Sequence, residues 1–154
     1  MASKLIEERH GAVGAWAKGC YFAGRAAMEA MLRPFDLGTT QWYILYQLVH
    51  NGSTMQRDLV RLLQVERATL SVIVGALVRK GWVEQVVDDV DQRRKLLRVT
   101  PAGTALWAKL PDLSAVINEA AFANISDADI EVAVRVLRVA TDRLNAFINK
   151  GSIA

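Results

Sequence analysis

The hydrophobic pattern of this chain changes from a helical to a strand-like period at Gly81, and this change limits the fold more than any other feature. Ahead of Gly81, a short helix is expected after the capping-box pattern Ser53–Gln56, and a second helix begins near Glu66. Their inward positions recur at spacings of three and four residues: Leu59, Leu62 and Leu63, then Leu70, Ile73, Val74, Leu77 and Val78. Two short helices joined by a tight turn predict a helix-turn-helix.

The segment behind Gly81 has the composition of a β-hairpin. Residues 82–87 and 95–99 are β-prone, and the polar run Asp88–Asp91 between them is typical of a turn. The loop and the return strand carry three adjacent cations, Arg93, Arg94 and Lys95. A helix-turn-helix followed directly by a basic hairpin predicts a winged helix, in a mainly α fold with a small β-hairpin wing (α+β).

Amphipathic helices are expected on both sides of this lobe. An N-terminal helix with the apolar stripe Trp16, Cys20, Ala23, Ala27 and Met31 ends at Pro34 and Gly38. A second runs from Thr39 or Thr40 to Asn51-Gly52, with Trp42, Leu45, Tyr46 and Val49 inward.

Two more helices are expected behind the hairpin. Thr100 caps one that begins at Pro101, and Pro111 should kink or break it. The pattern Ser126–Asp129 opens the last helix, whose inward residues are Ile130, Val134, Leu137, Leu144 and Ile148.

Composition excludes several classes of protein. A chain of 154 residues that is 52% hydrophobic predicts a single domain over 1–154 and not a disordered chain. The sequence has no apolar run long enough for a membrane span and no signal-peptide core at its start, so a cytoplasmic location is expected. One cysteine, Cys20, excludes an intrachain disulfide.

Positive charge is concentrated in the middle of the chain. The net charge is +1 over residues 1–50, +3 over residues 51–100 and −1 over residues 101–154. A local basic surface indicates nucleic-acid binding better than a global charge does, although a solvated helix face gives the same count.

The ordered motifs resemble the MarR (multiple antibiotic resistance regulator) family of transcription factors. The similarity is most specific over residues 37–103: Leu37–Trp42 with Ile44-Leu45, Ala68–Ser71 with Leu77–Val83, and Asp91–Lys95 with Leu97–Gly103. The resemblance implies a homodimeric regulator, and many relatives of this kind are repressors released by a small phenolic or aromatic ligand. It assigns residues 37–103 to a DNA-binding lobe on a palindromic operator, and residues 1–36 and 104–154 to dimerisation helices. Candidate interface residues on these helices are Leu5, Leu137, Leu144 and Phe147.

On this interpretation, the second helix of the helix-turn-helix enters the major groove with its N-terminal residues. The candidate base contacts are Arg67, Ala68, Thr69 and Ser71. Arg93 and Arg94 are placed to enter a minor groove, whereas Gln56, Arg57 and Lys95 are candidate phosphate contacts. Some of these side chains would be ordinary solvated groups if the lobe did not bind DNA.

Aromatic residues gather on the first two expected helices. The functional interpretation is a pocket for an aromatic or acyl (possibly thioester) ligand, built from Trp16, Cys20, Arg25, Trp42 and Tyr46, with Arg25 facing a carboxylate. The alternative is an ordinary core stripe.

Cys20 is expected to be a buried, inert thiol, and a redox-responsive regulator that uses it is the alternative. His10 and His50 have no further ligand at metal-binding spacing, so no metal site or cofactor is expected. The sequence carries no catalytic motif and does not predict an enzyme. A protein-binding winged helix without DNA remains the competing function class.

Overall fold

The computed structural model describes residues 2–87 and 95–149, with the side chains of residues 2–9 and 87 left outside the description. The chain divides into two compact units, residues 1–117 and residues 118–154, and each is described by itself. The sequence predicts a single domain, so this division differs from the expectation. The roles given to 1–36, 37–103 and 104–154 are not tested by it and stay predictions.

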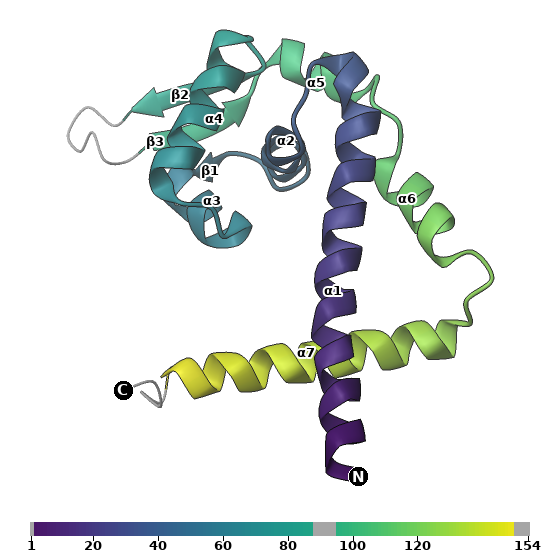
Figure 1. The fold of residues 1–154 in the computed structure, drawn as a ribbon. Coiled ribbons are helices and arrows are strands. Elements are labelled where there is room, and N and C mark those ends of the chain that lie inside the picture. The colour runs from purple at the N-terminus through teal and green to yellow at the C-terminus, as the bar shows by residue number, and fades with distance from the viewer. Residues whose placement is uncertain (1, 88–94, 150–154) are drawn as a thin grey trace. The chain divides into compact units, whose positions relative to one another are not determined.

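The first unit follows the expected order of elements (Figure 1). It contains α1 (Ala2–Leu32), the short 3-10 turn η1 (Arg33–Phe35), α2 (Thr39–Asn51), β1 (Thr54–Met55), α3 (Gln56–Leu63), α4 (Arg67–Arg79), β2 (Val83–Val87), β3 (Lys95–Val99) and α5 (Pro101–Trp107). The helix α6 (Leu113–Phe122) crosses the boundary between the units, and α7 (Asp127–Asn149) lies in the second. The mainly helical fold with a small antiparallel sheet is confirmed.

The wing is part of a three-stranded sheet in the order β1-β3-β2. β2 pairs with β3 from Val83 opposite Val99 to Val87 opposite Lys95, and β1 pairs with the other edge of β3 through Thr54 and Met55. The strand β1 was not predicted, and the capping box at Ser53 is wrong: Met55 is the N-cap of α3 and makes no side-chain cap bond. Pairing with β3 takes the place of the cap in fixing where α3 begins.

A core of aliphatic side chains joins the elements of the winged lobe. α2 contacts α1, α3, α4, α5, β1 and β3, so it lies at the centre of this packing. The completely buried members of the core are Leu32, Ile44, Leu45, Leu59, Leu70, Leu77 and Leu97. Tyr46, which the sequence places inward, is instead 42% exposed.

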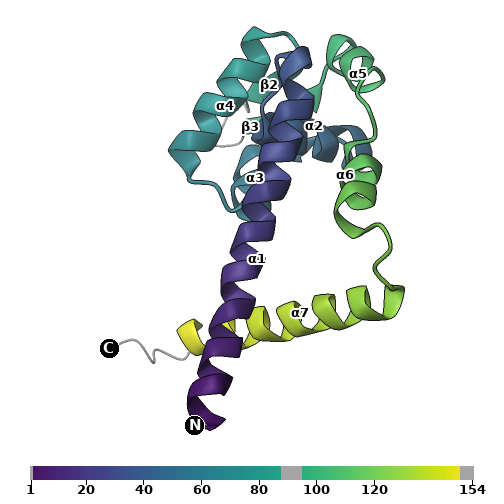
Figure 2. The ribbon, with the colours of Figure 1, turned by 45° about the vertical axis from the view of Figure 1, so that its right-hand side comes forward.

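Among the described side chains of α1, only those of its C-terminal turns join the core. Met28 and Leu32 are buried, whereas Trp16, Cys20, Ala23 and Ala27 of the predicted apolar stripe are exposed. A helix of 31 residues is roughly 46 Å long, and Figures 1 and 2 show it running well beyond the lobe. The predicted apolar stripe is therefore uncovered over most of its length in the single chain.

The second unit consists of the end of α6 and of α7. Ser126 caps α7 as expected, because its Oγ accepts from the backbone N of Asp129 at 3.2 Å and donates to that carboxylate. Ile130 is half-buried, but the other predicted inward residues of α7 are exposed, since no described element covers them.

The segment around Thr100 fixes α5 to the base of the wing. Thr100 Oγ1 accepts from the backbone N of Gly103 at 3.0 Å and donates to the carbonyl of Gly81, which confirms the predicted cap. The backbone N of Thr100 donates to the carbonyl of Trp82 at 3.0 Å. Pro111 lies between α5 and α6 and breaks the helix, as predicted.

Gly103 allows this close approach. A Cβ at this position would lie 2.1 Å from the carbonyl oxygen of Trp82 and 2.9 Å from Cγ2 of Val99. Neither the backbone carbonyl nor a half-buried valine packed against the core can move away cheaply.

We therefore expect Gly103→Ala to lower the free energy of unfolding by about 1–3 kcal/mol, measured by urea denaturation. Gly75→Ala is the matched control, because a Cβ there meets only Arg79 Nη1, at 3.4 Å, and alanine favours the helix by about 1 kcal/mol. A Gly103→Ala protein as stable as the parent contradicts the tight packing.

Candidate nucleic-acid interface

The helix α4 presents a continuous exposed surface at its N-terminal end. Leu70, Val74 and Leu77 are buried and fix the inner face of the helix. The predicted base contacts Arg67, Ala68, Thr69 and Ser71 are all exposed. Val72, which sequence reasoning left out of the site, is 70% exposed on the same stretch. The inward set predicted for this helix also excludes Val72, so its exposure agrees with the periodicity, but its apolar side chain gave no hydrogen-bonding group to name as a base contact.

The side chain of Gln56 is not on the surface, where a phosphate contact would have to be. The side chain is 7% exposed, and both of its polar atoms are used inside the lobe. Nε2 donates to Ser71 Oγ at 2.9 Å, and Oε1 accepts from Gln85 Nε2 at 2.6 Å. The expected role of Gln56 as a phosphate contact is therefore wrong, because it has no polar group facing solvent.

The remaining candidate cations differ in how they are placed. Arg57 is exposed and its Nε lies 3.7 Å from Asp58, a pair that contributes little in water. Lys95 is half-buried at the start of β3. Arg93 and Arg94 lie outside the described residues, so their role stays a prediction.

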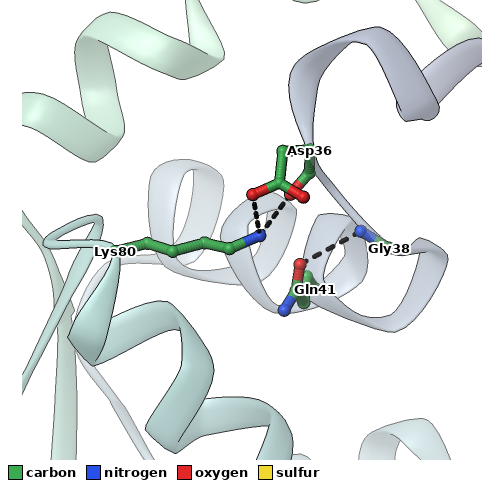
Figure 3. A network of polar contacts seen from close by, with 4 residues as sticks. All are labelled: Asp36, Gly38, Gln41 and Lys80. Carbon is green, nitrogen blue, oxygen red and sulfur yellow. Dashed lines mark hydrogen bonds and ion pairs between the residues drawn. The ribbon is translucent and has the colours of Figure 1, made fainter.

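Lys80, at the C-terminal end of α4, contacts Asp36 in the corner between α1 and α2 (Figure 3). Lys80 Nζ donates to the carbonyl oxygen of Asp36 and lies 2.9 Å from its carboxylate. Asp36 has a φ of 52°, and the backbone N of Gly38 donates to Gln41 Oε1 at 3.0 Å beside it. The ammonium also lies 4.8 Å from the centre of the Trp82 ring. This contact holds the end of α4 that is opposite the exposed candidate residues.

An aromatic cavity of about 430 Å³ lies where α2 faces α5 and the break that follows it. Trp42, Tyr46 and His50 line it from α2, and Trp107 lines it from α5. The ring centres of Trp42 and Trp107 are 5.5 Å apart, and those of Tyr46 and His50 are 4.4 Å apart. The sequence predicted Trp42 and Tyr46 as ligand contacts but not His50, which lies one turn after Tyr46 on the same helix. Trp107 was not predicted as a contact either, because only the packing of α5 on α2 brings it to this face.

The other predicted ligand contacts lie apart from this cavity. Trp16 is 78% exposed on α1, and Cys20 is also exposed. The expectation of a buried thiol is therefore wrong, and a redox role stays untested. Arg25 lines a different hollow with Tyr21, Thr40 and Tyr43, and its guanidinium donates to the hydroxyl of Tyr21 at 3.4 Å.

The predicted interface residues of α7 are accessible. Leu137, Leu144 and Phe147 are 41%, 63% and 50% exposed, while the side chain of Leu5 lies outside the description. Further large apolar side chains are exposed on α1 and α7: Val13, Trp16, Tyr21, Phe22, Val132, Val134, Val136, Val139 and Ile148.

Two classes of site are not found in the described part of the chain. No group of three or more His, Cys, Asp or Glu in residues 2–87 and 95–149 could hold a metal ion. No helix in those ranges is both long and apolar enough to span a bilayer.

Comparison with known proteins gives a consistent result. Residues 35–94 match the model of the MarR family. Over 91 residues the chain is 36% identical to the transcriptional activatory protein BadR of Rhodopseudomonas palustris, a match that covers 56% of this chain and 49% of BadR. The chain spans about half the length of curated relatives such as this one.

Solved structures share the fold. BpsR of Bordetella bronchiseptica, whose DNA binding is regulated by 6-hydroxynicotinic acid, superposes with a TM-score of 0.74 at 22% identity, covering 84% of this chain and 98% of BpsR. A MarR variant of E. coli in complex with operator DNA has a TM-score of 0.74 at 20% identity, covering 83% of this chain and 92% of that one.

Proposed function

We propose that this chain is a homodimeric transcriptional regulator of the MarR family that binds a palindromic DNA operator and is not an enzyme, because residues 35–94 match the family's model and its curated relatives are transcriptional regulators. The observation that carries the proposal is the exposed N-terminal surface of α4. A helix enters the major groove with its N-terminal residues, and the exposed set has the required chemistry. Arg67 supplies a donor for guanine or phosphate, Ser71 supplies a hydroxyl, and Ala68 and Thr69 supply methyl groups for thymine.

Two copies of the lobe are needed for tight binding. A single α4 helix makes few base contacts, but two lobes held about one DNA turn apart, roughly 34 Å, add their contacts. The exposed apolar residues of α1 and, separately, those of α7 are the faces that we assign to a second copy of this chain. Exposed apolar patches on a protein mark interaction sites, and a closed symmetric dimer would cover these two faces.

We assign the cavity between α2 and α5 to a small aromatic acid or its thioester. Trp42, Tyr46 and Trp107 offer ring faces for stacking, and His50 at its edge offers an N–H donor for a carboxylate. A volume of about 430 Å³ suits a single- or double-ring ligand. On this proposal the free protein represses transcription and the ligand releases it from DNA.

The DNA-binding role predicts a specific salt dependence. Arg67→Ala should weaken operator binding at low salt, and should reduce the slope of log Kd against log salt by about one per subunit if Arg67 contacts a phosphate. If it contacts guanine instead, the loss of about 1–3 kcal/mol should be confined to one base position. Fluorescence anisotropy on a fragment selected from the host genome measures both.

Arg79→Ala removes the same charge from the other end of α4 and is expected to change Kd less than Arg67→Ala. A wild-type protein with no salt-dependent binding to any promoter fragment would favour the protein-binding alternative.

The dimer proposal makes α7 the place to test. Leu144→Asp places a charge among the exposed apolar residues and should convert the dimer to a monomer in sedimentation equilibrium. Ala146→Asp is the matched control, because two residues along a helix correspond to about 200° around it. If Leu144→Asp and the parent have the same mass, the interface lies elsewhere.

The ligand proposal predicts stabilisation by aromatic acids. Benzoate and its ring-substituted analogues at 100-fold above Kd should raise the free energy of unfolding by about 2.7 kcal/mol and should release bound operator. Trp107→Ala should lose this stabilisation, whereas Trp16→Ala should keep it because Trp16 does not line the cavity. The opposite pattern would assign the ligand to α1.

A further inference from the structure

We propose that Gln56 and Gln85 are positioning residues that orient the hydroxyl of Ser71 so that it donates a hydrogen bond to the operator. The inference rests on the proposed DNA-binding function and makes it more specific. It assigns to Ser71 the selection of bases that present an acceptor in the major groove.

Three elements are joined by one chain of side-chain hydrogen bonds. Gln85 on β2 donates from Nε2 to Oε1 of Gln56 at 2.6 Å. Gln56, the first residue of α3, donates from Nε2 to Oγ of Ser71 on α4 at 2.9 Å. This series of hydrogen bonds therefore connects Gln85 in the wing, through the buried amide of Gln56, to Ser71 on the exposed surface of α4.

The middle residue of this chain is held rigidly. Gln56 is 7% exposed, and it follows directly on Thr54 and Met55, which pair with Leu97 and Leu96 of β3. A buried amide is costly unless its polar atoms are bonded, so Gln56 stabilises the lobe only while both partners stay in place. Both partners are side chains, and one of them lies on the surface assigned to DNA.

The orientation of the Gln56 amide sets the direction of the Ser71 hydroxyl. Oε1 of Gln56 is occupied by the Gln85 amide, so the NH₂ group faces Ser71. Because Ser71 Oγ accepts this bond, its own proton is directed away from Gln56. Ser71 is exposed, and its proton is free to meet an acceptor on DNA.

In the major groove the acceptors are guanine O6 and N7, adenine N7 and thymine O4, whereas the amino groups of cytosine and adenine are donors. A serine that rotates freely can serve either kind of group. One that is held as a donor distinguishes them, and the hydroxyl has less rotational freedom to lose on binding. Gln56 and Gln85 would thus influence specificity without touching DNA.

The experiment uses the full chain and an operator selected from the host genome, with every base pair varied singly. Anisotropy gives Kd for the wild type, Ser71→Ala, Gln56→Glu and the double variant Gln56→Glu/Ser71→Ala. Ser71→Ala should weaken operator binding about three- to tenfold and reduce the preference at one base position.

Gln56→Glu tests the direction of the chain. A carboxylate only accepts, so Ser71 must now donate to it and present a lone pair to DNA. The base preference at the position that Ser71 contacts should shift toward bases with an amino donor, and this shift should vanish in the double variant. Gln47→Glu is the matched control for the added charge, since Gln47 lies on α2 and bonds only to Asn51 among its described side-chain partners.

Gln85→Leu provides a second variant that adds no charge and leaves Gln56 buried. Gln85→Leu should weaken the base preference at the position that Ser71 contacts but should not shift it toward other bases. Thermal unfolding of this variant checks that the protein remains folded. The proposal is overturned if Gln56→Glu and Gln85→Leu weaken binding equally on every operator variant, and if the effect of Gln56→Glu is the same whether residue 71 is serine or alanine. Gln56 would then be a structural residue only. Absence of any salt-dependent DNA binding by the wild type instead overturns the proposed function itself.

Discussion

The winged lobe depends on a shared core of leucines, to which α1, α2, α3, α4 and β3 each contribute at least one completely buried side chain. Leu32 comes from α1, Leu45 from α2, Leu59 from α3, Leu77 from α4 and Leu97 from β3. Burial of one such side chain contributes about 1.5–3 kcal/mol, so losing any element exposes apolar surface on the others. The core fixes the inner face of α4 and leaves the outer face free to carry chemistry. Substitutions at Arg67 or Val72 are therefore expected to leave the fold intact, whereas one at Ser71 also removes a hydrogen-bond partner of buried Gln56.

The long helices depend on a different source of stability. No residue of α7 is buried in the single chain, and among residues 10–32 of α1 only Met28 and Leu32 are buried. Helices in water gain most of their stability from packing of an apolar face, not from intrinsic propensity. The proposed dimer would supply this packing, which makes folding of these helices and association one process.

The sequence predicts those features of the fold that are encoded locally. Helical periodicity, the stop at Gly81, the cap at Thr100 and the break at Pro111 each depend on a few neighbouring residues, and the structure has them all. Burial of Gln56 could not be predicted in this way, because its partners lie 15 and 29 residues away. The aromatic cavity was predicted only in part for the same reason: His50 and Trp107 come together through the packing of α5 on α2. Cys20 on α1 was predicted to be buried because periodicity identifies an apolar face but not what covers it.

The contact between Lys80 and Asp36 links the C-terminal end of α4 to the corner where α1 ends. Its carboxylate is largely open to solvent, so the ion pair is worth less than about 1 kcal/mol and opens and closes readily. Any twist of the last turn of α1 must either carry the end of α4 with it or break this pair. In a dimer whose two α4 helices have to match the repeat of DNA, a small rotation at this corner changes the distance between them. Under the proposed function, Lys80 would couple the corner between α1 and α2 to the end of α4, through an ion pair weak enough to break and re-form.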